Sequence, residues 1–186
     1  MKYVPFPELI TPRLRLRKLT MEDAALYYGR IGSSPQVTQY MLFQPHRDLS
    51  ESVASVEKAL RRYAEGQSYR FCIALRNNDE LIGVIEPLRF DERTGTCSFA
   101  YMLAKEFWGQ GYGTEALRAV LDFLFLEMEM ERVEADHMVE NAASGAVMRK
   151  AGMVCTGTIP GKYEKNGICH DAVCYCITRD RWEQNR

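Results

Sequence analysis

The feature that most constrains the fold is a glycine-rich turn that joins a strand to a helix within residues 99–125. Residues 99–103 alternate bulky and small apolar side chains, which is typical of a strand. Gly109, Gly111 and Gly113 then recur at every second position. The apolar residues after the turn have the spacing of one helical face; they are Leu117, Val120, Leu121, Leu124 and Met128. We therefore predict a helix that begins at about residues 112–114.

A helix that begins at such a turn exposes unpaired N–H groups at its positive end, and glycines let an anion approach the backbone closely. The turn is thus a candidate phosphate site, for a pyrophosphate in particular. It lacks the Gly-Lys-Ser/Thr ending of a P-loop. GQGYGT has Gly-x-Gly-x-Gly spacing and lies past the middle of the chain, unlike the dinucleotide fingerprint of a Rossmann fold. A tight turn without a ligand is the alternative.

Composition limits the classes of protein to which the chain can belong. Its 186 residues are 46% hydrophobic, which predicts one well-packed domain over residues 1–186. The net charge of −1 provides no overall field to attract DNA or RNA, so we expect no direct nucleic-acid partner. No apolar run approaches the ~20 residues of a membrane span, and the N-terminus lacks a signal-peptide core. We expect a cytoplasmic protein that does not associate with membranes.

The six cysteines include no Cys-x-x-Cys pair, so we expect free, buried thiols. The segment 169–176 is the densest cluster of potential metal ligands. Strand alternation puts Cys169 and Asp171 on one face of that segment. Three potential ligands remain on the other face: His170, Cys174 and Cys176. Because at most three side chains converge, we expect no metal site.

The remaining segments predict an α+β protein with a mixed sheet. Strands are expected at 11–19, 68–75, 81–90, 96–103 and 132–139, with a final pair around 153–159 and 168–178. Arginines alternate with leucines in the first of these, which indicates one solvated face. Helices are expected from Thr20 to about residues 29–32, over 35–41 after Ser34, from Ser50 onward and over 141–152. Three consecutive antiparallel strands thus lead into the glycine turn.

The segment ENAASGAVMRKAGM, residues 140–153, has more internal pattern than a helix requires. Asn141 is a good N-cap, Lys150 suits the negative end of the helix, and Gly152 suits its C-terminal cap. These features account for a helix without any function.

Both motifs resemble segments of the GNAT acetyltransferase superfamily. Its pyrophosphate turn has the pattern Gln/Arg-x-x-Gly-x-Gly/Ala, and here Trp108, Gly111 and Gly113 occupy the three defined positions. Trp108 departs from that pattern, but FWGQGYGTEAL is similar to the YWGKGYATEAL form of the RimJ/RimL type, which acetylates the N-termini of ribosomal proteins. Residues 140–153 resemble the NxxSxxVxxKxGF segment of the same enzymes, with Met153 in place of the phenylalanine. The resemblance extends over essentially the whole chain.

The resemblance implies a GNAT fold, in which helices flank a mixed, mostly antiparallel sheet whose central strands splay apart. It implies acetyl-CoA as cosubstrate and no metal. The implied cofactor-binding residues are Tyr101, Met102, Leu103, Trp108, Gly109, Gln110, Gly111, Tyr112, Gly113, Thr114, Asn141, Ser144 and Lys150. In the family, the asparagine contacts the pantetheine arm and the serine lies near the sulfur, so Ser144 is the candidate proton donor to the departing thiolate. A backbone N–H within residues 101–103 is expected to meet the thioester carbonyl.

The general base is the point at which the chain departs from the family. Many relatives have a glutamate on the central strand, where TCSFAYML has Ser98. Glu86 and Glu164 are the candidate replacements, acting directly or through water. An α-amine, with a pKa of about 7.7 to 8.0, needs less help than a lysine at about 10.4, so an N-terminal acceptor is compatible with a missing base.

The favoured acceptor is therefore the N-terminal α-amine of a protein or peptide, with Tyr40 and Phe43 as candidate acceptor contacts. The alternative is a small amine such as a polyamine, an amino acid analogue or an antibiotic. A polyamine enzyme is expected to have an acidic cluster around residues 40–50, where only Asp48 and Glu51 occur. A non-catalytic acyl-CoA sensor and an interaction domain without CoA are further hypotheses. Edge strands near the C-terminus are compatible with a homodimer as well as a monomer.

Overall fold

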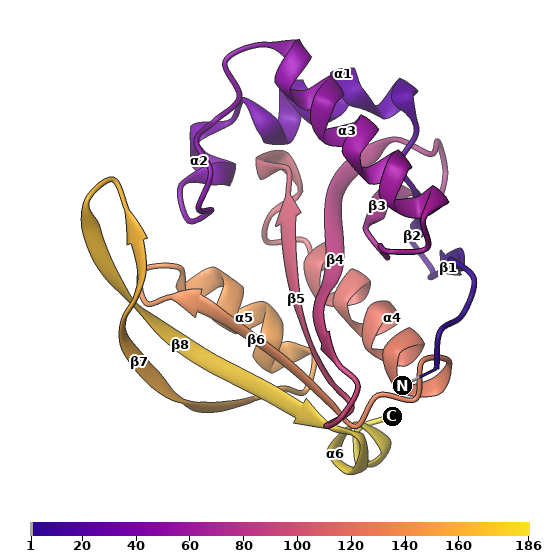
Figure 1. Cartoon of the computed structure of the whole chain (residues 1–186), viewed down its shortest axis with the longest axis vertical. Helices are drawn as coiled ribbons and strands as arrows, with labels where there is room; N and C mark the ends of the chain where they lie inside the picture. The colour runs from indigo at the N-terminus through magenta and orange to yellow at the C-terminus, as the bar shows by residue number, and fades with distance from the viewer. Residues whose placement is uncertain (1) are drawn as a thin grey trace.

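The computed structural model describes residues 2–186, which form an eight-stranded sheet with the order β1-β2-β3-β4-β5-β6-β8-β7 (Figure 1). The strands are β1 (Leu9–Ile10), β2 (Leu14–Lys18), β3 (Phe71–Leu75), β4 (Leu81–Asp91), β5 (Thr96–Leu103), β6 (Arg132–Met138), β7 (Val154–Lys165) and β8 (Ile168–Thr178). Neighbouring strands are antiparallel except for β5 and β6, which are parallel. The predicted mixed, mostly antiparallel sheet is confirmed.

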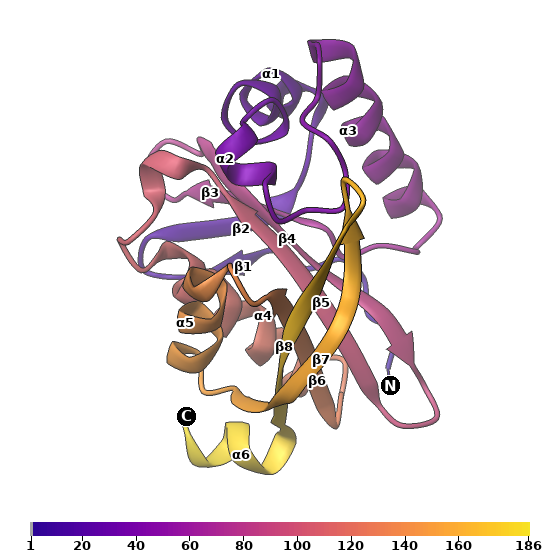
Figure 2. The same cartoon turned by 90° about the vertical axis from the view of Figure 1, so that its left-hand side faces the viewer.

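Helices cover both faces of the sheet (Figures 1 and 2). One face carries α4 (Tyr112–Leu126) and α5 (Ala142–Lys150), and the other carries α1 (Ala24–Tyr27), α2 (Pro35–Thr38) and α3 (Leu49–Ala64); α6 (Arg179–Gln184) follows β8. None of the helices in residues 2–186 has the length and apolar character needed to cross a membrane.

Several local predictions were wrong in detail. The single helix expected after Thr20 is divided into a 3-10 turn, α1 and a π-helical turn that ends at Gly32, because glycines weaken its second half. The two-residue strand β1 is too short to produce an alternating pattern, and α6 was also not predicted. The six cysteines are free, but Cys155 and Cys169 are exposed rather than buried.

Alternate residues of the inner strands supply two apolar cores. Phe71 and Ile73 of β3 pack into a core with α4, whereas Cys72 and Ala74 of the same strand pack against α1 and α3. Because both faces of β3 are covered, its sequence is apolar without interruption rather than alternating. The inner strands therefore form a buried central layer, and the sheet opens toward the C-terminal ends of β5 and β6.

The sheet opens between β5 and β6. These strands pair only over Thr96–Ser98 and Arg132–Glu134. Beyond this point β5 stays with β4 as far as Leu103, and β6 stays with β8 as far as Met138, so the two halves diverge (Figure 1). The splayed central strands implied by the family resemblance are confirmed.

The tip of the β7–β8 hairpin reaches the loop between α2 and α3, which lies above the opening (Figure 2). Lys165 Nζ donates to the Thr38 carbonyl over 2.8 Å, and burial lowers the pKa of this lysine. Gln44 Nε2 donates to Asn166 Oδ1 over 2.7 Å. The opening is therefore bridged on this side by contacts between segments more than 120 residues apart in sequence.

Arg17 and Asp23 form a bidentate ion pair that fixes the end of β2 to the first helical turn. The guanidinium donates over 2.8 and 2.9 Å, and the two side chains are 13% and 6% exposed. Burial by itself raises the pKa of Asp23, but the bonds from Arg17 and from the Thr20 N–H outweigh it and lower that pKa below 3.8.

We expect Asp23→Asn to lower the free energy of unfolding at pH 7 by about 2 kcal/mol, because it replaces charge-assisted hydrogen bonds. Folding lowers the pKa of Asp23, so this carboxylate stabilises the folded state fully at a pH above its unfolded-state pKa. The stabilisation is lost as the pH falls through its folded-state pKa. Urea unfolding at pH 7 and at acidic pH measures both effects, with the exposed Glu57→Gln as control. Equal stability of Asp23→Asn and wild type at pH 7 would contradict the expectation.

Candidate functional site

The glycine turn has the backbone geometry that its sequence predicts. Gly109 and Gly111 have φ angles of 74° and 84°, in the left-handed region that favours glycine. Gly111 is the N-cap of α4, and no side chain in the described chain caps this end by a hydrogen bond. The first N–H groups of α4 therefore remain available at the positive end of the helix, and the predicted helix start at residues 112–114 is confirmed.

Arg13, the residue before β2, contacts this turn and holds it in place. Its guanidinium donates to the Gln110 carbonyl over 3.0 Å and to Glu115 over 2.6 Å, and it lies 4.3 Å from the centre of the Tyr112 ring. Glu115 also accepts from Thr11 Oγ1 over 2.6 Å. The alternating pattern of β2 predicts only a solvated arginine face, so it gives no signal for this role. Arg13 therefore holds the turn in place, while its own charge is offset by Glu115.

Trp108 and Gly113 position the two ends of the turn. The Trp108 indole Nε1 donates to the Leu103 carbonyl over 2.7 Å, and the side chain remains 43% exposed. A Cβ at Gly113 would lie 3.5 Å from Val147 of α5, which is an ordinary contact. The turn is thus held to the end of β5 and lies against α5.

The register of β5 decides which backbone N–H groups face the opening. Ala104 N donates to the Ile82 carbonyl over 2.8 Å, which continues the β4–β5 ladder beyond the Leu103–Gly83 pair. Because N–H groups alternate in direction along an antiparallel strand, that of Met102 is directed toward β4 and those of Tyr101 and Leu103 are directed away from it. Pairing with β6 ends at Ser98, so the Tyr101 N–H points into the opening.

A cavity of about 230 Å³ occupies the opening, and Tyr40, Ser98, Tyr101, Asn141 and Ser144 are among its lining residues. Asn141 caps α5 by accepting from the Ser144 N–H over 3.3 Å. The Tyr101 hydroxyl donates to Ser144 Oγ over 3.2 Å. Burial raises the pKa of Tyr101 to about 12, so this phenol retains its proton at neutral pH.

A second cavity, of about 600 Å³, lies on the α3 face of the sheet and includes Phe43, Glu86 and Met102. It shares lining residues with the first cavity: Met41, Leu88, Ala100 and Tyr101. Glu86 lies opposite Ala100 in the sheet, and its carboxylate accepts from Arg62 over 2.9 Å and from Ser68 over 3.1 Å. The two cavities therefore adjoin beside Tyr101.

Two predicted site residues lie apart from these cavities. Glu164 is exposed on β7, paired with Cys169, and is not among the lining residues of either cavity. Lys150 is at the exposed end of α5 beside a separate cavity of about 380 Å³, where its carbonyl accepts from Arg118 over 2.6 Å. Residues 2–186 contain no group of three or more potential metal ligands placed to hold an ion, and the absence of a metal stays a prediction.

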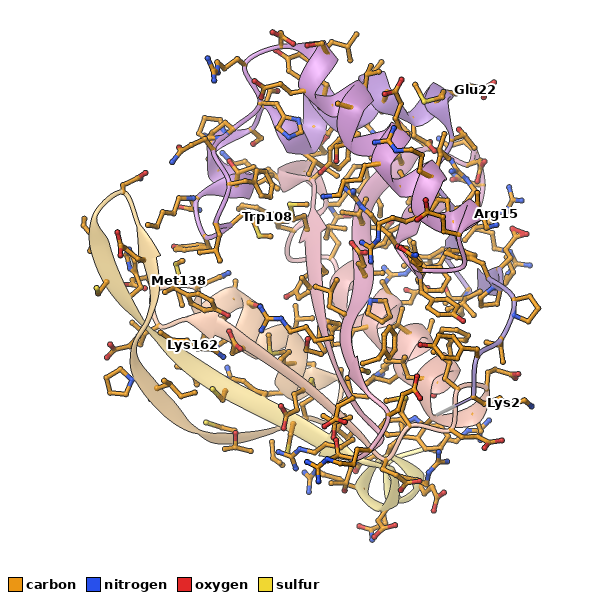
Figure 3. All side chains as sticks on the ribbon, viewed as in Figure 1. Lys2, Arg15, Glu22, Trp108, Met138 and Lys162 are labelled. Carbon is orange, nitrogen blue, oxygen red and sulfur yellow. The ribbon has the colours of Figure 1, made fainter. Side chains whose placement is uncertain are left out.

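Asp136 of β6 lines the first cavity, and no sequence motif points to it. Its carboxylate, 17% exposed, accepts from Lys162 Nζ and from the Tyr163 hydroxyl. Burial and this carboxylate together raise the pKa of Tyr163. Figure 3 shows Lys162 on the β6–β7 side of the molecule, with Met138 nearby and Trp108 near the end of β5. The sequence pattern does not identify Asp136 as a site residue, because one acidic residue in an alternating strand is typical of a solvated face.

His137 and Gly145 make a close contact beneath the first cavity. His137 is 7% exposed and its Nε2 has no hydrogen-bond partner among the described residues, while its Nδ1 lies 2.7 Å from the Met138 carbonyl. A Cβ at Gly145 would lie only 2.5 Å from His137 Nε2 and 3.0 Å from the Tyr175 hydroxyl.

We expect Gly145→Ala to lower the free energy of unfolding by about 1 to 3 kcal/mol, because α5 must move away from β6 to accept the methyl group. The matched control is Gly29→Ala, where nothing lies within 4 Å of the new Cβ. Urea unfolding measures both variants. A Gly145→Ala protein as stable as the control would show that the contact relaxes without cost.

Comparison with known proteins agrees with this geometry. Residues 13–154 match the family described as the acetyltransferase (GNAT) domain. An uncharacterised N-acetyltransferase, p20 of Bacillus licheniformis, is 34% identical over 92% of this chain and 96% of its own. A structure described as a putative ribosomal-protein-serine acetyltransferase from Vibrio cholerae superimposes with a TM-score of 0.82 at 23% identity, covering 94% of this chain and 98% of its own.

The spermidine N-acetyltransferase of Vibrio cholerae, solved with CoA and spermine, has a TM-score of 0.80 at 19% identity, with coverage of 93% and 99%. At these identities the solved structures establish the fold alone. The family match covers most of the chain, and p20 aligns along nearly all of it. The chain therefore belongs to the GNAT family of acetyltransferases.

Proposed function

We propose that the chain transfers the acetyl group of acetyl-CoA to the N-terminal α-amine of a protein or peptide, as the RimJ/RimL type does. The observation that carries this proposal is the junction of the two cavities beside Tyr101, whose N–H is directed into the opening between β5 and β6. A thioester on one face and an amine on the other reach each other at this point.

The residues present fit acetyl-CoA. The uncapped N-terminus of α4 suits the pyrophosphate, since its free N–H groups lie at the positive end of the helix and Arg13 holds the turn that precedes them. Asn141, the N-cap of α5, and Ser144 line the cavity in the opening, and Val147 lies beside Gly113 of the turn, so this part of α5 leads from the opening to the turn. Acetyl-CoA supplies the activated acetyl group, and these residues hold it. Lys150 lies at the far end of α5 beside the separate cavity and has no part in this proposal.

The reacting groups come from β5 and α5. The Tyr101 N–H is positioned to stabilise negative charge on the carbonyl oxygen. The hydrogen bond from Tyr101 to Ser144 joins two hydroxyl groups beside the opening. This pair can donate a proton to the sulfur as the C–S bond breaks, and it regains that proton from solvent, which receives the proton that the amine loses. Glu86 faces the acceptor side, where its carboxylate can accept the amine proton through water. Glu164 has no part in this proposal because of its exposed position.

The acidic residues of the loop disfavour a polyamine acceptor. Asp48 accepts from the Ser50 N–H over 2.8 Å and caps α3, and Glu51 lies 3.5 Å from Arg47. Glu51 is offset by Arg47, which leaves Asp48 as a single negative charge rather than the acidic cluster that a polycation needs. The sensor hypothesis rests on Ser98, whose hydroxyl donates to the Leu88 carbonyl over 3.3 Å and supplies no base.

The test is a peptide with a free α-amine and one internal lysine, incubated with acetyl-CoA and mapped by fragmentation mass spectrometry. We expect the acetyl group on the α-amine, with a pH–rate inflection near the α-amine pKa of about 7.7 to 8.0. Acetylation of the lysine, or of polyamines alone, would contradict the proposed acceptor. An inflection well below pH 6 would exclude simple titration of the acceptor amine.

A further inference from the structure

The second cavity has an excess of positive charge. Its charged lining residues are Arg47, Glu51, Lys58, Arg62, Arg70 and Glu86. The two carboxylates are already paired, Glu51 with Arg47 and Glu86 with Arg62. Neither Arg70 nor Lys58 forms an ion pair within residues 2–186. Two cations of this cavity are therefore without a protein counter-ion.

Neutral groups hold Arg70 in place. Its Nη1 donates to Ser55 Oγ over 3.2 Å, its Nη2 donates to the Tyr27 hydroxyl over 3.0 Å, and the guanidinium lies 5.3 Å from the centre of the Tyr27 ring. These contacts fix the orientation of the guanidinium but do not neutralise its charge. A partly buried arginine that is fixed in this way is preorganised to bind a carboxylate.

The sheet relates Arg70 to the reaction centre. Phe71 pairs with Ile85, so Arg70 lies across from Glu86, one residue beyond that pair. Glu86 in turn pairs with Ala100, the neighbour of Tyr101. Arg70 and Ala100 are thus two strand spacings apart, about 10 Å. If an amine lies beside Tyr101 while a carboxylate of the same molecule binds Arg70, many bonds must separate the two groups. The amine and carboxylate of one free amino acid are too close together for this.

We propose that the second cavity selects peptide acceptors whose second or third residue is aspartate or glutamate, with that side-chain carboxylate bound by Arg70. This inference rests on the proposed function, because it takes the second cavity as the acceptor site. The same unpaired cations repel polyamines. The second cavity therefore distinguishes acidic peptides from polyamines both by attracting the former and by repelling the latter.

The test compares kcat/KM for alanyl-glutamyl-alaninamide and alanyl-glutaminyl-alaninamide, which differ only in charge. Wild type is expected to prefer the glutamyl peptide by about tenfold or more, the size of one charge-assisted interaction. Arg70→Gln is expected to bring this ratio close to one. Because the ratio is measured within one enzyme preparation, any loss of folded Arg70→Gln protein cancels. Arg61→Gln, on the exposed side of α3 outside the cavity, is expected to keep the wild-type ratio.

The inference would be overturned if wild type had equal kcat/KM values for the glutamyl and glutaminyl peptides. It would also be overturned if Arg70→Gln preferred the glutamyl peptide as strongly as wild type does. Free alanine and alaninamide form a second pair of acceptors. If wild type prefers free alanine over alaninamide but does not prefer the glutamyl peptide, the carboxylate that binds belongs to a free amino acid, and the proposal of a peptide acceptor is overturned. If no amine is acetylated, the proposed function fails, and calorimetric binding of the two peptides still decides the inference. Tighter binding of the glutamyl peptide to wild type than to Arg70→Gln supports it, and equal binding overturns it.

Discussion

Gly111→Asp is expected to abolish acetyl-CoA binding and leave the fold intact. Gly111 has a φ of 84° and precedes the free N–H groups of α4, so an aspartate there puts a carboxylate where the pyrophosphate is proposed to bind. Wild type at an acetyl-CoA concentration 100 times the dissociation constant gains about 2.7 kcal/mol of stability. Thermal unfolding with and without acetyl-CoA is expected to show this gain in wild type and none in Gly111→Asp.

Gly111→Asp also loses stability because aspartate is strained at a left-handed φ, so this variant needs a control with the same strain at another position. Gly66 has a φ of 67° at the end of α3, and nothing lies within 4 Å of a Cβ there. Gly66→Asp therefore carries a similar backbone strain and the same charge, far from the turn in sequence. It is expected to lose stability without ligand, of the order of 1 to 2 kcal/mol, and to keep the full gain from acetyl-CoA. A Gly111→Asp protein that retains this gain would show that the turn does not bind the cofactor.

Tyr101→Phe and Ser144→Ala are each expected to lower kcat about a hundredfold, with little change in the KM for acetyl-CoA. Both variants remove the hydroxyl pair proposed to donate a proton to the thiolate. Since the two hydroxyls form one hydrogen bond, the double variant is expected to lose little more than either single variant. Steady-state kinetics measure these effects, and the exposed Tyr3→Phe serves as control.

The pH dependence gives an independent test of the same pair. Because burial raises the pKa of Tyr101 to about 12, the phenol stays protonated throughout the range in which the enzyme is measured. The wild-type kcat is therefore expected to show no loss from tyrosine ionisation up to about pH 10, the pKa of an ordinary tyrosine. Additive effects of the two substitutions, or a fall in kcat near pH 10, would contradict the role of the pair.

The sequence was sufficient for the parts of the fold that depend on local pattern. Short alternating or continuously apolar runs located the inner strands, and the glycines located the start of α4. The separation of β5 from β6 has no local signature, since β6 has the same alternation whether or not it pairs with β5. It was predicted only through the resemblance to the GNAT family. The division of the helix after Thr20 was missed because 3-10, α and π turns differ in their backbone hydrogen bonds, which so short a segment does not display in its side-chain pattern.

The site was less predictable than the fold, because its polar contacts join distant segments. Arg13 and Gln110 are 97 positions apart, and Arg70 contacts Tyr27 across 43. On single strands such arginines have the pattern of a solvated face. For Tyr101 the sequence predicted a backbone role, but its hydroxyl became relevant only when α5 placed Ser144 beside it. The sequence alone did not distinguish Glu86 from Glu164 as the candidate general base. Of the two, only Glu86 lines one of the two adjoining cavities.

We expect this chain to turn over acetyl-CoA rather than only to bind it. The most direct measurement is the release of free CoA thiol from acetyl-CoA by wild type, with and without a peptide bearing a free α-amine. We expect release that depends on the peptide and equals the amount of acetylated peptide formed. Saturable acetyl-CoA binding without release in the presence of any amine would contradict it, and would identify the chain as an acyl-CoA sensor.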